Sequence, residues 1–157
     1  MKPRQSDPPR NERIPSPANP ELPPPARISE AGKTLLVVDD DPTVRDLETE
    51  VLRMQGYNVL AAGSAAEALR VAASTATIHL LITDLMMPEV DGLELTRRFR
   101  KLHPKTPVLM VSGSLPMLHA RSEADLDHFD FLAKPFQLNE LLQKVRKLLD
   151  APLPLPT

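Results

Sequence analysis

The chain contains 157 residues, and its 19 Lys and Arg residues against 21 Asp and Glu residues give a formal net charge of −2. This length suits a single domain, and the near-neutral charge argues against a protein that binds nucleic acid mainly by electrostatic attraction. The absence of cysteine excludes disulfides and thiolate metal sites. No apolar run approaches the roughly 18 residues of a transmembrane helix, and no secretory signal is visible. We therefore expect a cytoplasmic protein without membrane contact.

Prolines divide the chain into three parts. Nine of the 18 prolines lie in residues 1–32, and three lie in residues 151–157. The first segment has few large apolar side chains, so it cannot bury enough surface to offset the entropy lost on ordering. We predict a disordered proline-rich arm over residues 1–32, a folded domain over residues 33–150 and a disordered tail over residues 151–157.

The first half of the domain alternates strand and helix patterns. Residues 34–38 form a continuous apolar run, which is typical of a strand buried on both faces, and residues 57–61 form a weaker strand pattern. Asp41 before Pro42 predicts a capped helix start, and a Ser64–Glu67 capping box predicts the next helix. Gly56 ends the first helix, whose apolar positions are Val44, Leu47, Val51 and Met54.

The second half continues the alternation. Strand patterns cover residues 78–83, 107–111 and 129–133, and a poorly patterned segment over about 115–124 is a possible helix. Asp91 caps a helix with Leu95, Phe99 and Leu102 on one face. The clearest amphipathic helix carries Leu138, Leu141, Leu142, Val145, Leu148 and Leu149. Five strand–helix units with buried strands predict an α/β fold with a parallel sheet between helices.

Polar side chains stand where four of the predicted strands end. The first strand ends in Asp39, Asp40 and Asp41, the third in Asp84, the fourth in Ser112 and the fifth in Lys134. In such folds, ligands bind outside the carboxyl ends of the strands. Carboxylates about 4 Å apart repel by roughly 4 kcal/mol at an effective dielectric constant of 20, so a cation is needed to keep them ionised together. Hard oxygen ligands without His or Cys suit Mg²⁺.

Each of these residues also has a purely structural interpretation. Asp41 and Asp91 are well placed as helix caps, and Asp39 with Asp40 suits an ordinary polar turn. Ser112 opens a Ser-Gly-Ser turn, and a single lysine is commonly a surface residue. The agreement of four strand ends, rather than any one residue, favours a functional site.

Four motifs carry a resemblance to a known family. They are LVVDDDP at 36–42, LITDLMMP at 81–88 followed by Asp91 and Gly92, VLMVSG at 108–113 and KPF at 134–136. In this order and spacing they resemble a response-regulator receiver domain of two-component signalling over the whole of residues 33–150. The resemblance implies a doubly wound, flavodoxin-like (βα)5 fold whose five-stranded parallel sheet has the order 2-1-3-4-5.

The resemblance implies a role for each matched residue. Asp84 matches the phosphoacceptor, which becomes a 4-aspartylphosphate. Asp39 and Asp40 match the acidic pair that holds Mg²⁺, with Asp40 preferred as the direct ligand. The backbone carbonyl of Met86 matches a further metal ligand beside Asp84.

Three further positions match the groups that respond to the phosphoryl group. Ser112 and Lys134 match the hydroxyl and the ammonium that contact it, and the Lys134–Pro135 bond is cis by analogy. Phe131 matches the aromatic switch position, although an ordinary core aromatic is an equally good interpretation of it. The expected donor is a histidine kinase or phosphotransfer protein.

The expected function is a phosphorylation-dependent switch rather than an enzyme acting on a separate substrate. Phosphorylation is expected to change the surface formed by the fourth helix, the fifth strand and the fifth helix, which regulates a partner or relays phosphate. We expect no DNA-binding output domain and a monomer or a weak, phosphorylation-dependent dimer.

Met86 and Ser114 stand at positions that influence attack of water in this family, and neither is acidic or amide-bearing, so we predict slow self-hydrolysis. Residues 125–130 replace the small turn usual before the fifth strand.

Two alternatives compete with this interpretation. The run from Asp39 to Thr43 fits the DxDxT loop of haloacid-dehalogenase-like phosphohydrolases, in which Asp39 would be the nucleophile and Asp41 the general acid. That alternative leaves the Asp84 motif unexplained. The other is a pseudo-receiver, a protein-binding module that no longer accepts phosphate, and the complete set of site residues argues against it.

Overall fold

The structure is a computed structural model that describes residues 32–113 and 129–150. The predicted arm over residues 1–32, apart from Gly32, lies outside the described residues. So do the possible helix over 115–124, the departure at 125–128 and the tail over 151–157. Within the described ranges, no helix has both the length and the apolar character needed to cross a bilayer.

Five parallel strands form the centre of the molecule. They are β1 (Thr34–Val38), β2 (Asn58–Ala62), β3 (Leu80–Asp84), β4 (Val108–Ser112) and β5 (Phe129–Ala133). Their order is β2-β1-β3-β4-β5, and every neighbouring pair is parallel. The predicted α/β class, strand order and doubly wound topology are confirmed. Since all strands run the same way, their carboxyl ends meet at one edge of the sheet.

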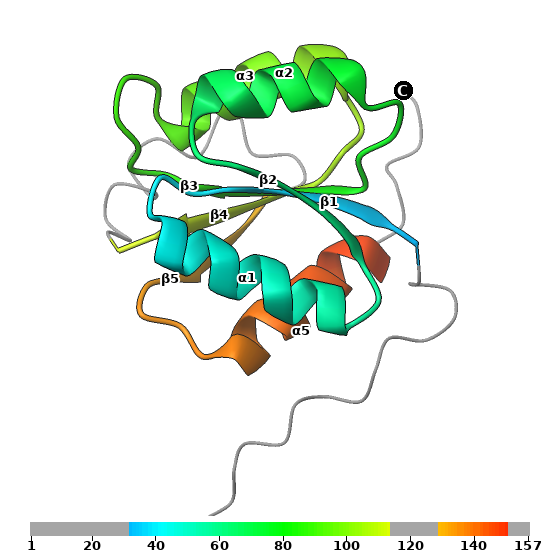
Figure 1. Ribbon diagram of the computed structural model, residues 1–157, viewed down its shortest axis with the longest axis vertical. Coiled ribbons are helices and arrows are strands. Elements are labelled where there is room, and N and C mark those ends of the chain that lie inside the picture. The colour runs from blue at the N-terminus through cyan, green and yellow to red at the C-terminus, as the bar shows by residue number, and fades with distance from the viewer. Residues whose placement is uncertain (1–31, 114–128, 151–157) are drawn as a thin grey trace, which may run out of the picture.

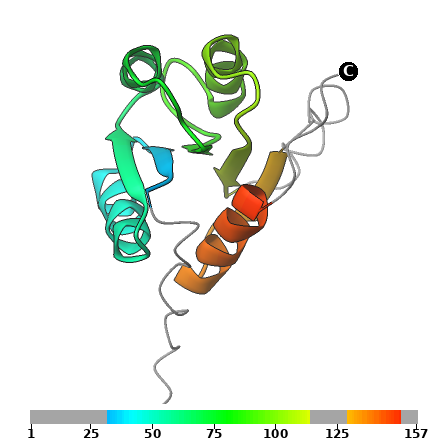
Figure 2. The same cartoon turned by 90° about the vertical axis from the view of Figure 1, so that its right-hand side faces the viewer.

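Four described helices cover the two faces of this sheet. They are α1 (Pro42–Met54), α2 (Ala65–Ser74), α3 (Gly92–Leu102) and α5 (Leu138–Asp150). Helices α1 and α5 lie on one side and α2 and α3 on the other, as both views show (Figures 1 and 2). The sheet is therefore covered on both faces, which is why β1 near its centre reads as a continuous apolar run.

Alternate residues of the strands divide the core into two clusters. Leu35 and Val37 of β1 belong to the cluster that contains the buried side chains of α1 and α5. Leu36 and Val38 point to the other face and pack with Leu95 and other buried residues of α2 and α3. This division follows from the two-residue period of side chains along a strand.

Three helices begin close to the carboxyl edge of the sheet with a side-chain cap. The Asp41 carboxylate accepts a bond from the Thr43 N–H at 2.9 Å, and Ser64 Oγ accepts one from the Glu67 N–H at 3.2 Å. Asp91 Oδ1 accepts a bond from the Glu94 N–H at 2.9 Å. The three predicted helix starts are confirmed, and they fix the loops that leave β1, β2 and β3.

The predicted apolar faces of α1 and α3 are wrong at three positions. Leu47, Met54 and Leu102 are 48%, 60% and 47% exposed, although they share the helical spacing of buried neighbours. In α1 the buried residues are Glu48, Thr49, Val51 and Leu52. The helix is thus rotated relative to its apolar stripe, because packing against the sheet and α5 decides which side is covered.

Strands β2, β3 and β4 also begin and end one or two residues later than predicted.

Candidate functional site

Three carboxylates gather at the carboxyl edge of the sheet. Asp39 directly follows β1 and Asp84 ends β3, and the pairing of Val38 with Thr83 places the two acids on neighbouring strands. Oxygen atoms of Asp39, Asp40 and Asp84 all lie within 4.8 Å of one another. Asp39 and Asp84 are buried, whereas Asp40 is exposed. The sheet order therefore brings together acids that are separated by 45 positions in the sequence numbering.

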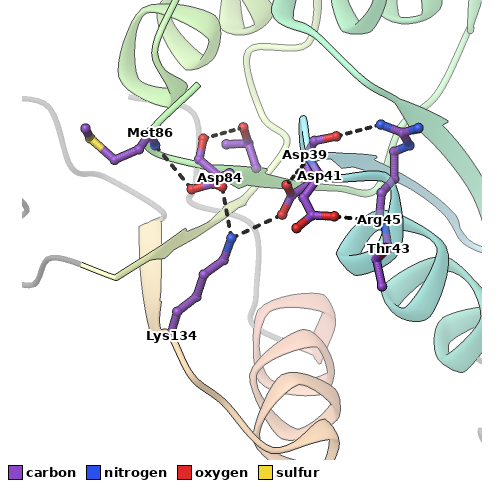
Figure 3. Close-up of polar contacts among 8 residues, drawn as sticks. Asp39, Asp41, Thr43, Arg45, Asp84, Met86 and Lys134 are labelled. Carbon is purple, nitrogen blue, oxygen red and sulfur yellow. Dashed lines mark hydrogen bonds and ion pairs between the residues drawn. The ribbon is translucent and has the colours of Figure 1, made fainter. Parts of the chain in front are cut away.

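Lys134 supplies positive charge to this acidic group. Its Nζ donates to Asp84 Oδ2 at 2.9 Å and to Asp39 Oδ2 at 3.2 Å, so the ammonium lies between the two carboxylates (Figure 3). Lys134 follows β5, and its backbone N–H donates to the Ser112 carbonyl at 2.8 Å. The Lys134–Pro135 bond is cis, as the resemblance implied.

Burial and charge alter the acidity of both partners. Burial raises the pKa of Asp39, and the negative charge of Asp84 adds to this effect, while the Asp41 N–H and Lys134 act against it. Burial disfavours the charged form of Lys134, but its bonds to Asp84 and Asp39 outweigh this and raise the pKa of the ammonium. The raised pKa of Asp39 means that Lys134 does not fully offset the cost of burying this carboxylate. Additional positive charge would therefore be favourable at this site.

The backbone around Asp84 holds its carboxylate in place. Asp84 Oδ1 accepts a bond from the Met86 N–H at 3.2 Å, and the Thr83 hydroxyl donates to the Asp84 carbonyl at 3.0 Å. A β-carbon at Gly92 would collide with the Asp84 carbonyl and would lie 2.9 Å from Met110 Sδ. Glycine at the start of α3 therefore permits the helix to approach the end of β3.

The donor set fits a hard divalent cation. The side-chain ligands that Asp39, Asp40 and Asp84 offer are all carboxylate oxygens, and Mg²⁺ prefers such ligands together with waters. Asp40 is exposed, which leaves one side of the group open to solvent. The Met86 side chain is 56% exposed, and its residue lies in the loop that leaves β3.

Ser112 lies on β4, the neighbour of β3, and Phe131 lies on β5 at the edge of the sheet. Ser112 ends β4 and is fully buried, and it pairs with Ala133 of β5. Phe131, two residues before Ala133, is partly buried and packs against the core cluster on the α2 and α3 side. Since side chains two apart point to the same face, Ala133 and Phe131 share a face of β5. Ser114 lies outside the described residues.

Two residues near the site were not anticipated from the sequence. Arg45 Nη1 donates to the Asp39 carbonyl at 2.8 Å, on the opposite side of Asp39 from Lys134 (Figure 3). Glu48, one turn further along α1, is only 2% exposed. A signal for Arg45 existed, because it stands four residues after the Asp41 cap and hence one helical turn from the strand end. No sequence pattern distinguishes Glu48 from a solvent-exposed glutamate.

The geometry also bears on the phosphohydrolase alternative. That alternative uses Asp39 as nucleophile and Asp41 as general acid. Asp39 is 1% exposed, and its Oδ1 accepts the Asp41 N–H at 2.9 Å while its Oδ2 accepts from Lys134. Asp41 caps α1 through its own carboxylate. Asp84 is thus the carboxylate at the junction of the Lys134 and Met86 bonds, which that alternative leaves without a role.

Comparison with known proteins gives a consistent family match. Residues 35–146 match the family model described as the response regulator receiver domain. The DNA-binding transcriptional regulator NtrC of Azospirillum brasilense is 34% identical over 124 residues, which are 79% of this chain and 26% of that protein. The response regulator MprA of Mycobacterium ulcerans is 38% identical over 115 residues, 73% of this chain and 49% of that one. The chain thus spans at most about half the length of these two relatives.

A solved structure supports the same family match. The response regulator protein TrrA of Thermotoga maritima, in complex with Mg²⁺-BeF, is 34% identical and superposes with a TM-score of 0.64. The match covers 74% of this chain and 98% of that one.

Proposed function

The chain belongs to the response regulator receiver domains, and from that premise we propose that it is a signalling switch that accepts a phosphoryl group on Asp84. The observation that carries the proposal is the joint position of Asp39, Asp40, Asp84 and Lys134 at one edge of the sheet. We propose a histidine kinase or a phosphotransfer protein as the donor.

Phosphoryl transfer to Asp84 forms one bond and breaks another. A carboxylate oxygen of Asp84 bonds to phosphorus as the bond from phosphorus to the imidazole nitrogen of a phosphohistidine breaks. The nitrogen keeps the electron pair and takes up a proton. A carboxylate is a weak nucleophile, so positioning and charge neutralisation must supply the rate.

Positioning is the task of the groups that hold Asp84. The Met86 N–H fixes Oδ1, and Lys134 holds Oδ2. When Mg²⁺ is bound by the carboxylates of Asp39, Asp40 and Asp84 and by the Met86 carbonyl, it supplies positive charge that offsets the charge of the incoming group. The Mg²⁺-BeF complex of TrrA supports the choice of this cation.

Lys134 and Ser112 then convert the new charge into a change of shape. An aspartyl phosphate adds nearly two negative charges by analogy with other phosphorylated side chains, and Lys134 moves its bonds to the phosphoryl oxygens. A charge-assisted bond contributes about 1.5–3 kcal/mol and a hydroxyl bond about 1, while a shift from 1:99 to 99:1 needs about 5.5 kcal/mol. Contacts made mainly in the phosphorylated state therefore supply a large part of the shift.

The change reaches the surface through β4 and β5. Movement of the Ser112 hydroxyl towards the phosphoryl group vacates space on the face of β5 where Phe131 lies. Phe131 has no hydroxyl, so turning inward leaves no polar group unsatisfied. The altered surface of β5 and α5 regulates a partner or passes the phosphoryl group along a relay.

Phosphorylation by a small donor tests the proposal directly. The chain is incubated with acetyl phosphate with and without Mg²⁺, and its mass is measured. We expect a Mg²⁺-dependent gain of one phosphoryl group that is lost in Asp84→Asn and kept in Asp41→Asn, since asparagine also caps helices well. A gain that persists in Asp84→Asn and disappears in Asp39→Asn would favour the phosphohydrolase. No gain at all would favour a protein-binding pseudo-receiver.

A further inference from the structure

The backbone of Asp39, the first acidic residue after β1, is held through both its N–H and its carbonyl. The Asp39 N–H donates to the Ala62 carbonyl of β2 at 3.2 Å, and the Asp39 carbonyl accepts Nη1 of Arg45 at 2.8 Å. This carbonyl belongs to the peptide between Asp39 and Asp40, so its orientation sets the direction in which the Asp40 side chain leaves the strand end. Arg45 engages the backbone and leaves the carboxylate oxygens available to a cation.

Gly63 provides the space that the Arg45 guanidinium occupies. A β-carbon built on Gly63 would lie 2.8 Å from Arg45 Nη1 and 3.5 Å from Cζ. Real β-carbons do not approach other atoms as closely as 2.8 Å, so any side chain at position 63 must displace the guanidinium. The Gly63 N–H donates to Glu67 Oε2 at 2.9 Å, which ties this point of the loop to the start of α2. The guanidinium therefore rests against the loop from β2 to α2.

We propose that Arg45 and Gly63 act as a pair that positions the Asp39–Asp40 peptide for divalent cation binding. Arg45 is a positioning residue, since it reaches the cation ligands only through the Asp39 carbonyl. This inference rests on the proposed function because it concerns the same cation site. Groups that orient metal ligands commonly change affinity by about 10- to 100-fold when they are removed.

Helix α1 contains a matched control for this contact. Arg53, two turns further along α1, donates to the Val59 carbonyl of β2 at 3.0 Å. Both arginines thus bond from α1 to a backbone carbonyl in or directly after a strand, but Arg53 does so away from the acidic group. An effect of Arg45 on cation binding that Arg53 lacks cannot come from the general attachment of α1.

Calorimetric titration of the full chain with MgCl₂ measures the contact. We expect Arg45→Gln to raise the Mg²⁺ dissociation constant by about tenfold, in line with other residues that support metal ligands. Glutamine is too short to reach the Asp39 carbonyl, whereas Arg45→Lys keeps a donor and should restore part of the affinity. Arg53→Gln should change the constant less than about twofold. Urea unfolding of each variant establishes that it is folded.

A double-mutant cycle tests whether Gly63 acts through Arg45. Gly63→Ala should weaken Mg²⁺ binding in the parent, because the methyl group moves the guanidinium away from the Asp39 carbonyl. In the Arg45→Gln background the same change should have no further effect, so the two changes are not additive. Additive effects, an unchanged constant in Arg45→Gln, or an equal effect of Arg53→Gln would overturn the inference.

The outcome also separates this inference from the proposed function. A parent chain that binds Mg²⁺ but takes no phosphoryl group on Asp84 overturns the proposed function, while the binding data still decide the role of Arg45. A parent that is phosphorylated while Arg45→Gln binds Mg²⁺ normally overturns the inference alone. A parent that binds no Mg²⁺ overturns both.

Discussion

Glu48 brings an ionisable group to the buried side of α1. It is 2% exposed, and its Oε1 has no hydrogen-bond partner among the described residues. Burial raises the pKa of Glu48 to about 8, and the negative charges of Asp39 and Asp84 add to this effect while Lys134 opposes it. The carboxyl group is therefore largely protonated at neutral pH in the folded chain, because ionisation would leave a buried charge without a bonded partner.

Glu48 should make the folded state less stable as the pH rises. Its pKa is 4.5 in the unfolded chain and about 8 in the folded one, so the unfolded chain releases the proton first. The contribution of Glu48 to the free energy of unfolding is full below pH 4.5 and falls between pH 4.5 and 8. The fall is at most roughly 1.4 kcal/mol for each pH unit. Urea unfolding of Glu48→Gln without Mg²⁺ should show a flatter pH dependence over this range.

The control for this measurement lies on the same helix. Glu50 is exposed, so Glu50→Gln should keep the pH dependence of the parent. If Glu48→Gln and Glu50→Gln give the same pH dependence, burial of Glu48 does not control the stability of the chain.

Met86 leads to a prediction about the lifetime of the phosphoryl group. Its side chain is 56% exposed beside Asp84, to which its N–H donates. A thioether offers no strong hydrogen bond to an attacking water, so we predict a slow loss of the phosphoryl group. Met86→Asn should shorten the lifetime of the phosphorylated chain, followed by mass spectrometry after removal of the donor. Met86→Ala is the control, and an equal or greater shortening in that variant would contradict this account.

At the scale of elements, the junction of β3 and α3 decides where Asp84 lies. The Gly92 N–H donates to the Leu85 carbonyl at 2.8 Å, and the Leu85 N–H donates to the Val111 carbonyl at 2.9 Å. The start of α3 therefore closes over the end of β3, and Gly92 has no side chain that would prevent it. The packing of α3 against the end of β3 and the position of Asp84 therefore depend on each other.

Gly92→Ala should disturb both the packing of α3 and the position of Asp84. The added methyl group meets the Asp84 backbone carbonyl, which cannot move as a flexible side chain can. We expect a loss of about 1–3 kcal/mol in the free energy of unfolding, which is typical of overpacking, together with slower phosphorylation of Asp84. Both are measured on the same preparation by urea unfolding and acetyl phosphate labelling. Parent-like stability in Gly92→Ala would show that α3 can shift away without cost.

At the scale of the whole molecule, cation binding and folding are linked. Carboxylates from the ends of β1 and β3 meet only when the sheet is formed, so a cation that binds all three binds the folded chain. Ligand at a hundredfold excess over its dissociation constant stabilises a protein by about 2.7 kcal/mol. MgCl₂ should therefore raise the urea midpoint of the chain at constant ionic strength.

Asp40 offers the variant that separates specific binding from a general salt effect. It is exposed, so Asp40→Asn should fold normally in the absence of Mg²⁺ and gain much less stability when Mg²⁺ is added. Equal stabilisation of Asp40→Asn and the parent would mean that Mg²⁺ does not act at the acidic group.

The sequence was informative wherever the signal is local. Apolar and strand-like patterns identified all five strands, and β1 and β5 were predicted to the residue. Asp41, Ser64 and Asp91 identified three helix starts, because a capping side chain bonds to an N–H two or three residues further along. The polar residues at the strand ends were also visible, since each interrupts an apolar run.

The sequence by itself determined which chemical groups follow which strand, because strand burial and helix capping leave patterns within a few residues. Only the tertiary structure decided which of these groups meet. Lys134 bonds to Asp84 and Asp39 across 50 and 95 positions, and that contact exists because the sheet places β5 beside β4 and β4 beside β3. The rotation of α1, which buries Glu48 and exposes Leu47, depends on packing against the sheet and α5. No short stretch of sequence contains that information.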